Sequence, residues 1–388
     1  MKKVLFVVDE RKLGGVSVLL ESILKNINIK NLDITLLVLH NNGDRFSNIP
    51  KGIKVQYIDG MLDVIDLDFK QLLKSFKLIK AIKKLLISIS IKNGRIKNTI
   101  LRIRKKYGIS GFDTEVAFKA GFCSLFVACS DSSNKINWIH EDYATFNSTR
   151  RYEKTFKKIL PLFDKHVVVS NDAAKSFNNI YHQEAKTLII ENYINEKEIL
   201  KLACELPEHK TESSKLNIVT LARLSYEKGL DRLIEALGAI NKELDISKVS
   251  ISILGNGKMK KTLQEQINKN GLERTITIYE NLQNPYSFMK QHDMFIMPSR
   301  SESFGMVRIE SLILGLPVLT TNVSHTSEII NDKNGIIVEN SVDGIYHGLK
   351  EVILNPEKVD ILKENIKGYS YEKKNTEIML LIQKTLEE

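Results

Sequence analysis

The chain has 388 residues, of which 43% are hydrophobic and 27% are charged. This composition is typical of a globular protein, and the length is enough for two domains. No apolar run approaches the ~18 residues that a membrane-spanning helix needs. Met1–Lys3 lead into five apolar residues that end at Asp9, too few for a signal peptide, and three cysteines without metal-ligand spacing fit a reducing cytoplasm.

The net charge of +10 is concentrated in one segment. Between Lys70 and Lys106 there are 13 Lys and Arg residues and no Asp or Glu, which leaves 44 basic against 47 acidic residues elsewhere. The excess is therefore a local feature, which argues against a generally basic protein.

Short apolar, β-branched runs alternate with helical patterns along the whole chain. Continuous apolar strands indicate parallel sheets covered on both faces, and the alternation indicates doubly wound α/β domains. The predicted strands are Val4–Val8, Ile34–Leu39, Val55–Ile58, Glu115–Phe118, Ile136–Ile139, His166–Val169, Leu188–Ile190, Ile218–Ala222, Val249–Leu254, Ile276–Tyr279, Met294–Met297 and Val318–Thr321. Predicted helices between them include Val16–Asn26, Leu230–Ile240, Lys258–Asn270 and Val307–Leu314.

This number of strands is too large for one sheet. The polar segment Asn195–Lys215 carries no strand pattern, so we divide the chain near residue 191. Two such domains facing each other would present the carboxyl ends of their strands to a cleft, where ligands bind in this architecture.

Two turns are candidate anion sites. Gly14 and Gly15 follow the first strand, and paired glycines there allow a ligand close to the backbone, although a structural turn is equally compatible with them. The three spaced glycines of a dinucleotide fingerprint are absent, which argues against an NAD enzyme. Arg223 ends a later strand and Lys228 opens the next helix, an arrangement that suits a pyrophosphate or, alternatively, a solvated surface pair.

The segment His292–Ile330 is the most informative. A buried strand is followed by a polar loop with Glu302, then by a helix that begins near Phe304 and contains Glu310 among apolar positions. An unpaired carboxylate there is costly, so we expect Glu310 to bind a ligand diol while helix amides bind phosphate. The expected donor-binding residues of this segment are Ser303, Phe304, Gly305, Met306, Val307 and Glu310.

His140 follows the strand that ends in Trp138-Ile139. Spacing alone favours a hydrogen-bonded structural histidine over a catalytic one.

Together these residues resemble family 4 of the retaining glycosyltransferases, which adopt the two-Rossmann-domain GT-B fold. The resemblance covers nearly the whole chain and includes Gly14-Gly15, the WIHED around His140, Arg223 with Lys228-Gly229, and the spacing of Glu302 and Glu310. It implies an N-terminal acceptor-side domain (1–191), a C-terminal nucleotide-sugar domain (192–370) and a last helix (371–388) that crosses back onto the N-domain. Arg308 and the segment Asn192–Asn195 depart from the usual family pattern.

The resemblance also implies roles. Arg223 and Lys228 would bind the donor diphosphate, Glu310 the ribose hydroxyls and Glu302 the transferred sugar, with His140 near the anomeric carbon. The family transfers hexosyl- or hexosaminyl-type sugars with retention and implies no cofactor and no metal. Alternatives are a sugar-nucleotide epimerase of the same fold and a non-catalytic partner subunit. Nucleic acid is not an expected partner, because the basic segment and the residue after it offer only Phe76 and Tyr107 for base stacking.

The basic segment also has helical periodicity. Apolar residues recur at spacings of three and four, from Leu72 through Phe76, Ile79, Ile82 and Leu86 to Ile89, whereas Lys70, Lys74, Lys77, Lys80 and Lys84 lie on the other side. The first interpretation is a helix that packs its apolar side on the core and exposes its lysines to water. The second, which the absence of acidic residues favours, is a surface attracted to anionic lipid. We therefore expect a cytoplasmic enzyme, peripheral on the inner membrane face, that extends a lipid-linked glycan acceptor for a bacterial surface polysaccharide.

Overall fold

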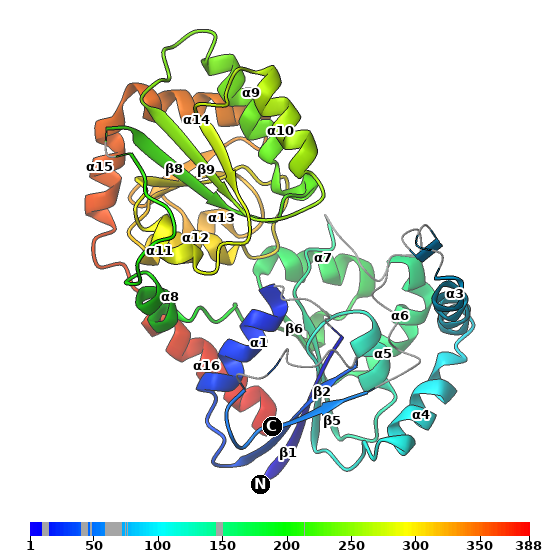
Figure 1. Cartoon of the computed structure of the whole chain (residues 1–388). Coiled ribbons are helices and arrows are strands. Elements are labelled where there is room, and N and C mark those ends of the chain that lie inside the picture. Colours follow the sequence, from blue (N-terminus) through cyan, green and yellow to red (C-terminus); the bar gives the residue numbers. More distant parts are fainter. Residues whose placement is uncertain are drawn as a thin grey trace. The chain divides into compact units, whose positions relative to one another are not determined.

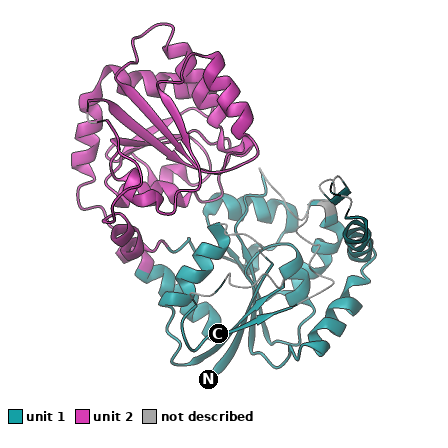
Figure 2. Ribbon diagram, viewed as in Figure 1, with its two compact units in different colours: residues 1–193, 376–388 teal, residues 194–375 magenta. Residues whose placement is uncertain are grey.

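A computed structural model describes residues 1–9, 15–39, 46, 49–58, 72–73, 75, 77–144, 150–212 and 214–388 of the chain (Figure 1). The chain forms two compact units, one of residues 1–193 together with 376–388 and the other of residues 194–375 (Figure 2). Each unit is built around its own parallel sheet.

The described residues of the N-terminal unit form a seven-stranded sheet in the order β3-β2-β1-β4-β5-β6-β7. All its neighbouring strands are parallel, with Val4 of β1 opposite Ile34 of β2 and Thr114 of β4. The strands are β1 (Lys2–Val8), β2 (Leu32–Val38), β3 (Lys54–Tyr57), β4 (Thr114–Ala117), β5 (Asn134–Ile139), β6 (Lys165–Val168) and β7 (Thr187–Ile189). The α-helices are α1 (Gly15–Asn26), α3 (Leu78–Lys92), α4 (Ile96–Lys106), α5 (Phe122–Ala128), α6 (Glu153–Ile159) and α7 (Asn171–Tyr181).

The C-terminal unit has a six-stranded parallel sheet among its described residues, in the order β10-β9-β8-β11-β12-β13. Its strands are β8 (Leu216–Leu221), β9 (Val249–Leu254), β10 (Ile276–Tyr279), β11 (Met294–Met297), β12 (Val318–Thr321) and β13 (Gly335–Val338). Its α-helices are α8 (Glu196–Leu202), α9 (Leu230–Ile240), α10 (Lys260–Lys269), α11 (Pro285–Met289), α12 (Met306–Ile313), α13 (Thr326–Ile329), α14 (Val342–Leu354) and α15 (Pro356–Asn365). The chain ends in α16 (Glu372–Glu387), which from residue 376 belongs to the N-terminal unit.

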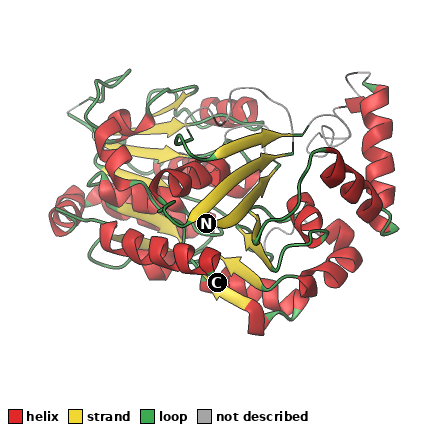
Figure 3. Ribbon diagram, turned by 90° about the horizontal axis from the view of Figure 1, so that it is seen from below, coloured by secondary structure: helices red, strands yellow, loops and turns green. Residues whose placement is uncertain are grey.

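Both sheets are buried because their strands are apolar on both faces. Val4 to Val8 of β1 are at most 1% exposed, and Ile251 and Ile253 of β9 are fully buried. In the C-terminal unit α9 packs against α10 and α14, whereas α8 packs against α11 and α12. Helices and strands alternate along most of the chain, and Figure 3 shows helices around the strands. The expected doubly wound α/β fold is therefore confirmed.

The last helix joins the N-terminal unit. From residue 376 onward, Ile378, Ile382 and Leu386 of α16 are at most 1% exposed. Thr114 donates a hydrogen bond of 3.2 Å to the carbonyl oxygen of Leu386, and the Gln383 amide donates one to Asn28. A segment from the end of the chain therefore completes the core of the first unit.

Candidate active site

Two neighbouring strands of the C-terminal sheet carry most of the expected site residues. The chain places β9 and β10 on one side of β8 and then returns to place β11 on the other side. The connections that leave the carboxyl ends of β8 and β11 therefore run toward opposite edges of the sheet. We call this place the β8–β11 switch point, and ligands bind at such points in open α/β sheets. The first loop carries Arg223 and Lys228, and the second carries Glu302.

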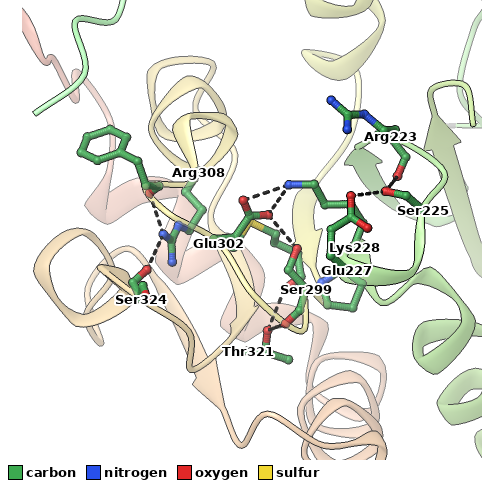
Figure 4. A network of polar contacts seen from close by, with 12 residues as sticks. Arg223, Ser225, Glu227, Lys228, Ser299, Glu302, Arg308, Thr321 and Ser324 are labelled. Atoms are coloured by element: carbon green, nitrogen blue, oxygen red, sulfur yellow. Dashed lines mark hydrogen bonds and ion pairs between the residues drawn. The ribbon is translucent and has the colours of Figure 1, made fainter. Parts of the chain in front are cut away.

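An ion pair joins these two loops. The Lys228 ammonium lies 2.7 Å and 2.9 Å from the two carboxylate oxygens of Glu302 (Figure 4). Ser299 donates a hydrogen bond of 2.8 Å to the same carboxylate, and Thr321 of β12 donates one of 2.6 Å to the Ser299 carbonyl oxygen. An ammonium has three N–H groups, so Lys228 retains a donor for a ligand while Glu302 orients it.

Close packing of the backbone holds the two loops together. Gly229 has a φ of +63° and separates Lys228 from α9. A Cβ atom at this position would lie 2.0 Å from the Pro298 carbonyl oxygen, so only glycine allows the loop after β8 to approach the loop after β11 so closely.

Arg223 differs from Lys228 in having no carboxylate within hydrogen-bond distance among the described residues. Its side chain is exposed, and among the described residues no hydrogen bond or ion pair engages its guanidinium. Its backbone carbonyl accepts a hydrogen bond of 2.8 Å from the Ser225 amide, which shapes the turn that follows β8. The loop after β8 therefore exposes the Arg223 guanidinium at the same edge of the sheet as Lys228.

The start of α12 supplies backbone donors. Gly305 has a φ of +72° and precedes the first helical residue, Met306. The fully buried Arg308 ties this start to the loop after β12, because its guanidinium donates to the carbonyl oxygens of Phe304 (2.8 Å) and Ser324 (3.1 Å) and to the Thr326 hydroxyl. Burial lowers the pKa of Arg308 to about 10, so it stays positively charged beneath the helix start at neutral pH.

Glu310 lies one turn further along α12, where it is partly buried. Burial raises the pKa of its carboxyl group to about 7, and a hydrogen bond from the Tyr286 hydroxyl of α11 opposes that shift. Burial and the nearby Glu310 in turn raise the pKa of Tyr286 well above its usual value. A carboxylate with so few partners retains acceptor capacity for an incoming pair of hydroxyl groups.

A second ion pair, between Arg300 and Asp231, stabilises the loop that follows β8. Arg300 donates two hydrogen bonds of 2.7 Å to the Asp231 carboxylate, and its guanidinium carbon lies 3.9 Å from the centre of the Tyr226 ring. Arg300 also donates a hydrogen bond of 2.8 Å to the Tyr226 carbonyl oxygen. These contacts among Arg300, Asp231 and Tyr226 stabilise the turn that contains Lys228.

His140 belongs to the N-terminal unit, directly after β5. Its Nε2 lies 3.1 Å from the Phe118 carbonyl oxygen, and the rings of the two residues are 4.9 Å apart. Burial, together with the Lys119 charge, lowers the pKa of His140 to about 4, so the ring is neutral at pH 7. Nε2 then donates to Phe118, and Nδ1 is left as a hydrogen-bond acceptor.

The same unit contains a cavity of about 310 Å³ behind α3. Lys84 of α3 and Lys119, which follows β4, line it together with the hydroxyl-bearing residues Ser88 and Tyr152. Asp9 at the end of β1 also lines the cavity, and the Lys119 ammonium lies 2.9 Å from its carboxylate. The rest of its wall is apolar and includes Ile87, Ile91, Phe122, Leu125 and Phe156.

The remaining predicted residues are distributed as follows. Gly15 begins α1, whereas Gly14 and Lys74 lie outside the described residues. Lys77 and Lys80 are exposed near the start of α3, but Lys84 is partly buried on the side of the helix that faces the cavity. Ser303 to Val307 all lie in the loop and first turn that lead into α12.

Comparisons with known proteins identify the family of the C-terminal unit and the fold of the chain. Residues 205–369, nearly the whole C-terminal unit, match the family model of the glycosyl transferases group 1. The C-terminal unit therefore contains a domain of this family. The O-antigen biosynthesis glycosyltransferase WclY of Escherichia coli is 34% identical over 173 residues, which are 44% of this chain and 46% of WclY. The alpha-monoglucosyldiacylglycerol synthase of Streptococcus pneumoniae is 26% identical over 60% of this chain and 56% of the synthase.

The chain thus spans about half the length of these curated relatives. The fold comparison reaches further, because the crystal structure of Anabaena Alr3699/HepE in complex with UDP and glucose matches 100% of both chains with a TM-score of 0.71 at 16% identity. The whole chain therefore has a GT-B-like fold, and the family resemblance seen in the sequence is confirmed.

Several positioning residues escaped the sequence analysis. In the folded chain Ser299 contacts Glu302, Tyr286 contacts Glu310 and Arg300 contacts Asp231. Ser299 and Arg300 lie in the loop already identified as a candidate site, which was the one available signal. Tyr286 lies in a short helix that no motif marks.

Proposed function

We propose that the chain is a glycosyltransferase that moves a hexosyl- or hexosaminyl-type sugar from a nucleoside-diphosphate sugar to a glycan acceptor, with retention of configuration. The observation that carries the proposal is the arrangement at the β8–β11 switch point. There the Lys228–Glu302 pair spans the two loops, and the exposed Arg223 guanidinium lies on the same loop as Lys228. The C-terminal unit would be the donor-side domain and the N-terminal unit the acceptor-side domain.

The chemistry of transfer explains these residue types. As the bond between the sugar and the diphosphate breaks, negative charge develops on the diphosphate and positive charge on the sugar ring. The negative charge on the diphosphate is stabilised by Arg223, by the free N–H of Lys228 and by the amides of Gly305 to Val307. The carboxylate of Glu302 stabilises the positive charge on the sugar ring and keeps Lys228 in place. Glu310 accepts hydrogen bonds from the ribose hydroxyls, and Nδ1 of His140 accepts one from the sugar.

For the acceptor, we propose a lipid-linked glycan in bacterial surface polysaccharide synthesis, reached from the inner face of the cell membrane. Two relatives support this choice, since one is named for O-antigen biosynthesis and the other for a glycosylated diacylglycerol. The cavity behind α3 combines Lys84 and the Lys119–Asp9 ion pair with an apolar wall for a neighbouring lipid or sugar face. The apolar wall suits the lipid part of such an acceptor better than a neutral free sugar.

A panel of nucleotide sugars tests the function. Each is added to the purified chain and the melting temperature is measured, because a ligand that binds only the folded state at 100 times its Kd stabilises it by about 2.7 kcal/mol. UDP sugars lead the panel, since UDP is bound in the matching Anabaena structure. The donor that stabilises the chain is then incubated with a membrane-lipid extract. Labelled glycolipid with retained anomeric configuration supports the proposal.

The same incubation separates the alternatives. An isomeric nucleotide sugar formed without acceptor would indicate an epimerase, and a chain that no nucleotide sugar stabilises would indicate a non-catalytic partner subunit. Either result would contradict the proposed transfer.

A further inference from the structure

Helix α3 turns its apolar side away from the protein. Its buried residues are Ala81, Ile87, Ser88 and Ile91, and Lys84 lies among them. By contrast, six large apolar side chains of the same helix are between 46% and 74% exposed. These are Leu78, Ile79, Ile82, Leu85, Leu86 and Ile89. The first interpretation of this sequence, a helix that packs its apolar side on the core, is therefore wrong.

These six residues form one continuous face. At 100° per residue they cover a single side of the helix, opposite the stripe of Ala81, Lys84 and Ser88. Isolated exposed apolar residues are normal on a protein surface, but a contiguous apolar face of a helix marks an interaction surface. We refer to the six residues as the outer face of α3.

Exposed basic residues lie on α3 and on the neighbouring α4. Lys77, Lys80, Lys83 and Lys92 of this region are exposed, and so are Lys97, Arg102, Lys105 and Lys106 in and around α4, which packs beside α3. The sequence from residue 70 to residue 106 contains no Asp or Glu. An apolar helix face with a basic border is the pattern of helices that lie in the interface of anionic bilayers.

We propose that the outer face of α3 inserts into an anionic membrane surface, with the flanking lysines held at the level of the lipid headgroups. The proposal rests on the proposed function for its biological role, because a lipid-linked acceptor requires the chain at a membrane, but its physical argument is independent. None of the described helices is long and apolar enough to cross a bilayer. A second copy of the chain is the less suitable occupant, since a symmetric contact through α3 would bring identical lysines together.

The inner side of α3 adds a structural consequence. Lys84, Ile87, Ser88 and Ile91 line the cavity of about 310 Å³ described above. One helix thus presents apolar side chains outward and forms the cavity wall inward. Docking through the outer face would place that wall one helix diameter, about 10 Å, from the lipid headgroups.

Vesicle flotation tests the insertion. The full chain is mixed with vesicles of phosphatidylcholine alone or with 30% phosphatidylglycerol, and the bound fraction is measured at low and high salt. We expect binding only to the anionic vesicles. The Ile82→Gln/Leu86→Gln variant should bind at least about tenfold more weakly, because interfacial binding scales with the apolar area that is buried.

A matched control keeps the result specific. Leu354 and Ile361 of the C-terminal unit are 55% and 60% exposed, close to the 58% and 60% of Ile82 and Leu86. Leu354→Gln/Ile361→Gln should bind vesicles like the unchanged chain. Melting temperatures of both double variants establish that each is folded.

Tryptophan fluorescence tests the insertion directly. The only tryptophan, Trp138, is 1% exposed and gives a constant background. On anionic vesicles, Leu86→Trp should shift its emission to the blue and be quenched by lipids brominated on the acyl chain, whereas Ile361→Trp should show neither change.

Three outcomes would overturn the proposal. They are absence of binding to anionic vesicles at low salt, equal binding by both double variants, and a dimer in solution that Ile82→Gln/Leu86→Gln dissociates. Nucleotide-sugar stabilisation of the same proteins is measured in parallel without vesicles. A chain that binds its donor but not vesicles refutes only the membrane face, whereas a chain that binds vesicles but no donor refutes the proposed transfer.

Discussion

Glu310 is the proposed ribose-binding residue, and burial of its carboxylate lowers the stability of the folded chain. Its carboxyl group has a pKa of about 7 in the folded chain, against an ordinary value of 4.5. Between these two pH values the folded state holds a proton that the unfolded state has lost, so stability decreases as the pH rises from 4.5 through 7. The cost above pH 7 is at most about 3 kcal/mol, reduced by the partial exposure of the side chain.

We therefore expect Glu310→Gln to stabilise the protein in a pH-dependent way. The amide cannot ionise, so the melting temperature should rise by a few degrees at pH 8 and remain close to that of the unchanged chain at pH 5. Thermal unfolding monitored by circular dichroism at both pH values measures the difference. Glu265→Gln, on the exposed side of α10, is the control and should show no gain. An equal effect of Glu310→Gln at pH 5 and pH 8 would contradict the assigned ionisation.

His140 and His166 allow a second comparison between residues. Burial lowers the pKa of both to about 4, but His166 is completely buried between Phe163 and Phe177, whereas His140 is only partly buried. His140→Ala should lower the melting temperature by only a few degrees and abolish most transfer activity. His166→Ala should unfold the chain at a much lower temperature. A large loss of stability in His140→Ala would indicate a structural histidine instead.

At the scale of elements, α12 depends on glycine at both ends. Gly305 and Gly315 have φ angles of +72° and +78°, so alanine at either position adds a backbone strain of about 1–2 kcal/mol. A Cβ atom at Gly315 would meet nothing within 4 Å, whereas one at Gly305 would lie 2.6 Å from the Arg308 guanidinium. That guanidinium is fully buried and hydrogen-bonded, so it has little room to move.

Gly305→Ala should therefore be more destabilising than Gly315→Ala. Urea unfolding of the two variants gives the free energies directly, with Gly315→Ala as the measure of backbone strain alone. Gly305→Ala should also weaken nucleotide binding, because it displaces the amides at the start of α12. Equal free energies of unfolding would mean that Arg308 adjusts to the new methyl group.

Periodicity predicted most elements because it reflects burial directly. The run Val4–Val8 is a central strand, and its neighbours along the sheet were identified in the same way. The strand β13 (Gly335–Val338) was missed, since Asn334-Gly335 indicates a turn and only three apolar residues follow. The spacing predicted a helix from Leu72 to Ile89, and the structure has α3 from Leu78 to Lys92. Periodicity alone does not determine which side of a helix faces the protein.

The candidate site could be predicted only in part, for a related reason. Arg223, Lys228 and Glu302 lie at strand ends, and parallel strands bring such ends to one edge of a sheet. The Tyr286 hydrogen bond to Glu310 joins residues 24 positions apart on two helices, and no local pattern encodes it. Arg308 departs from the family pattern, and only its three hydrogen bonds in the folded chain explain it.

At the scale of the whole molecule, the end of the chain belongs to the core of its first unit. Leu386 of α16 is fully buried, whereas Leu380 of the same helix is 66% exposed. Leu386→Ala should cost about 2–5 kcal/mol, and Leu380→Ala should have almost no effect. Chemical unfolding measures both. A small cost for Leu386→Ala would mean that the N-terminal unit is stable without the last turns of α16.

The central claim is that the β8–β11 switch point binds the diphosphate of a nucleotide sugar. Calorimetric titration with the nucleoside diphosphate tests it most directly, on the unchanged chain and on Arg223→Ala, Lys228→Ala and the control Lys269→Ala at the exposed end of α10. We predict one site per chain, at least tenfold weaker binding in each of the first two variants, since a charged hydrogen bond contributes about 1.5–3 kcal/mol, and unchanged binding in the control. Equal affinity in all four proteins, or no binding at millimolar nucleotide, would contradict the account.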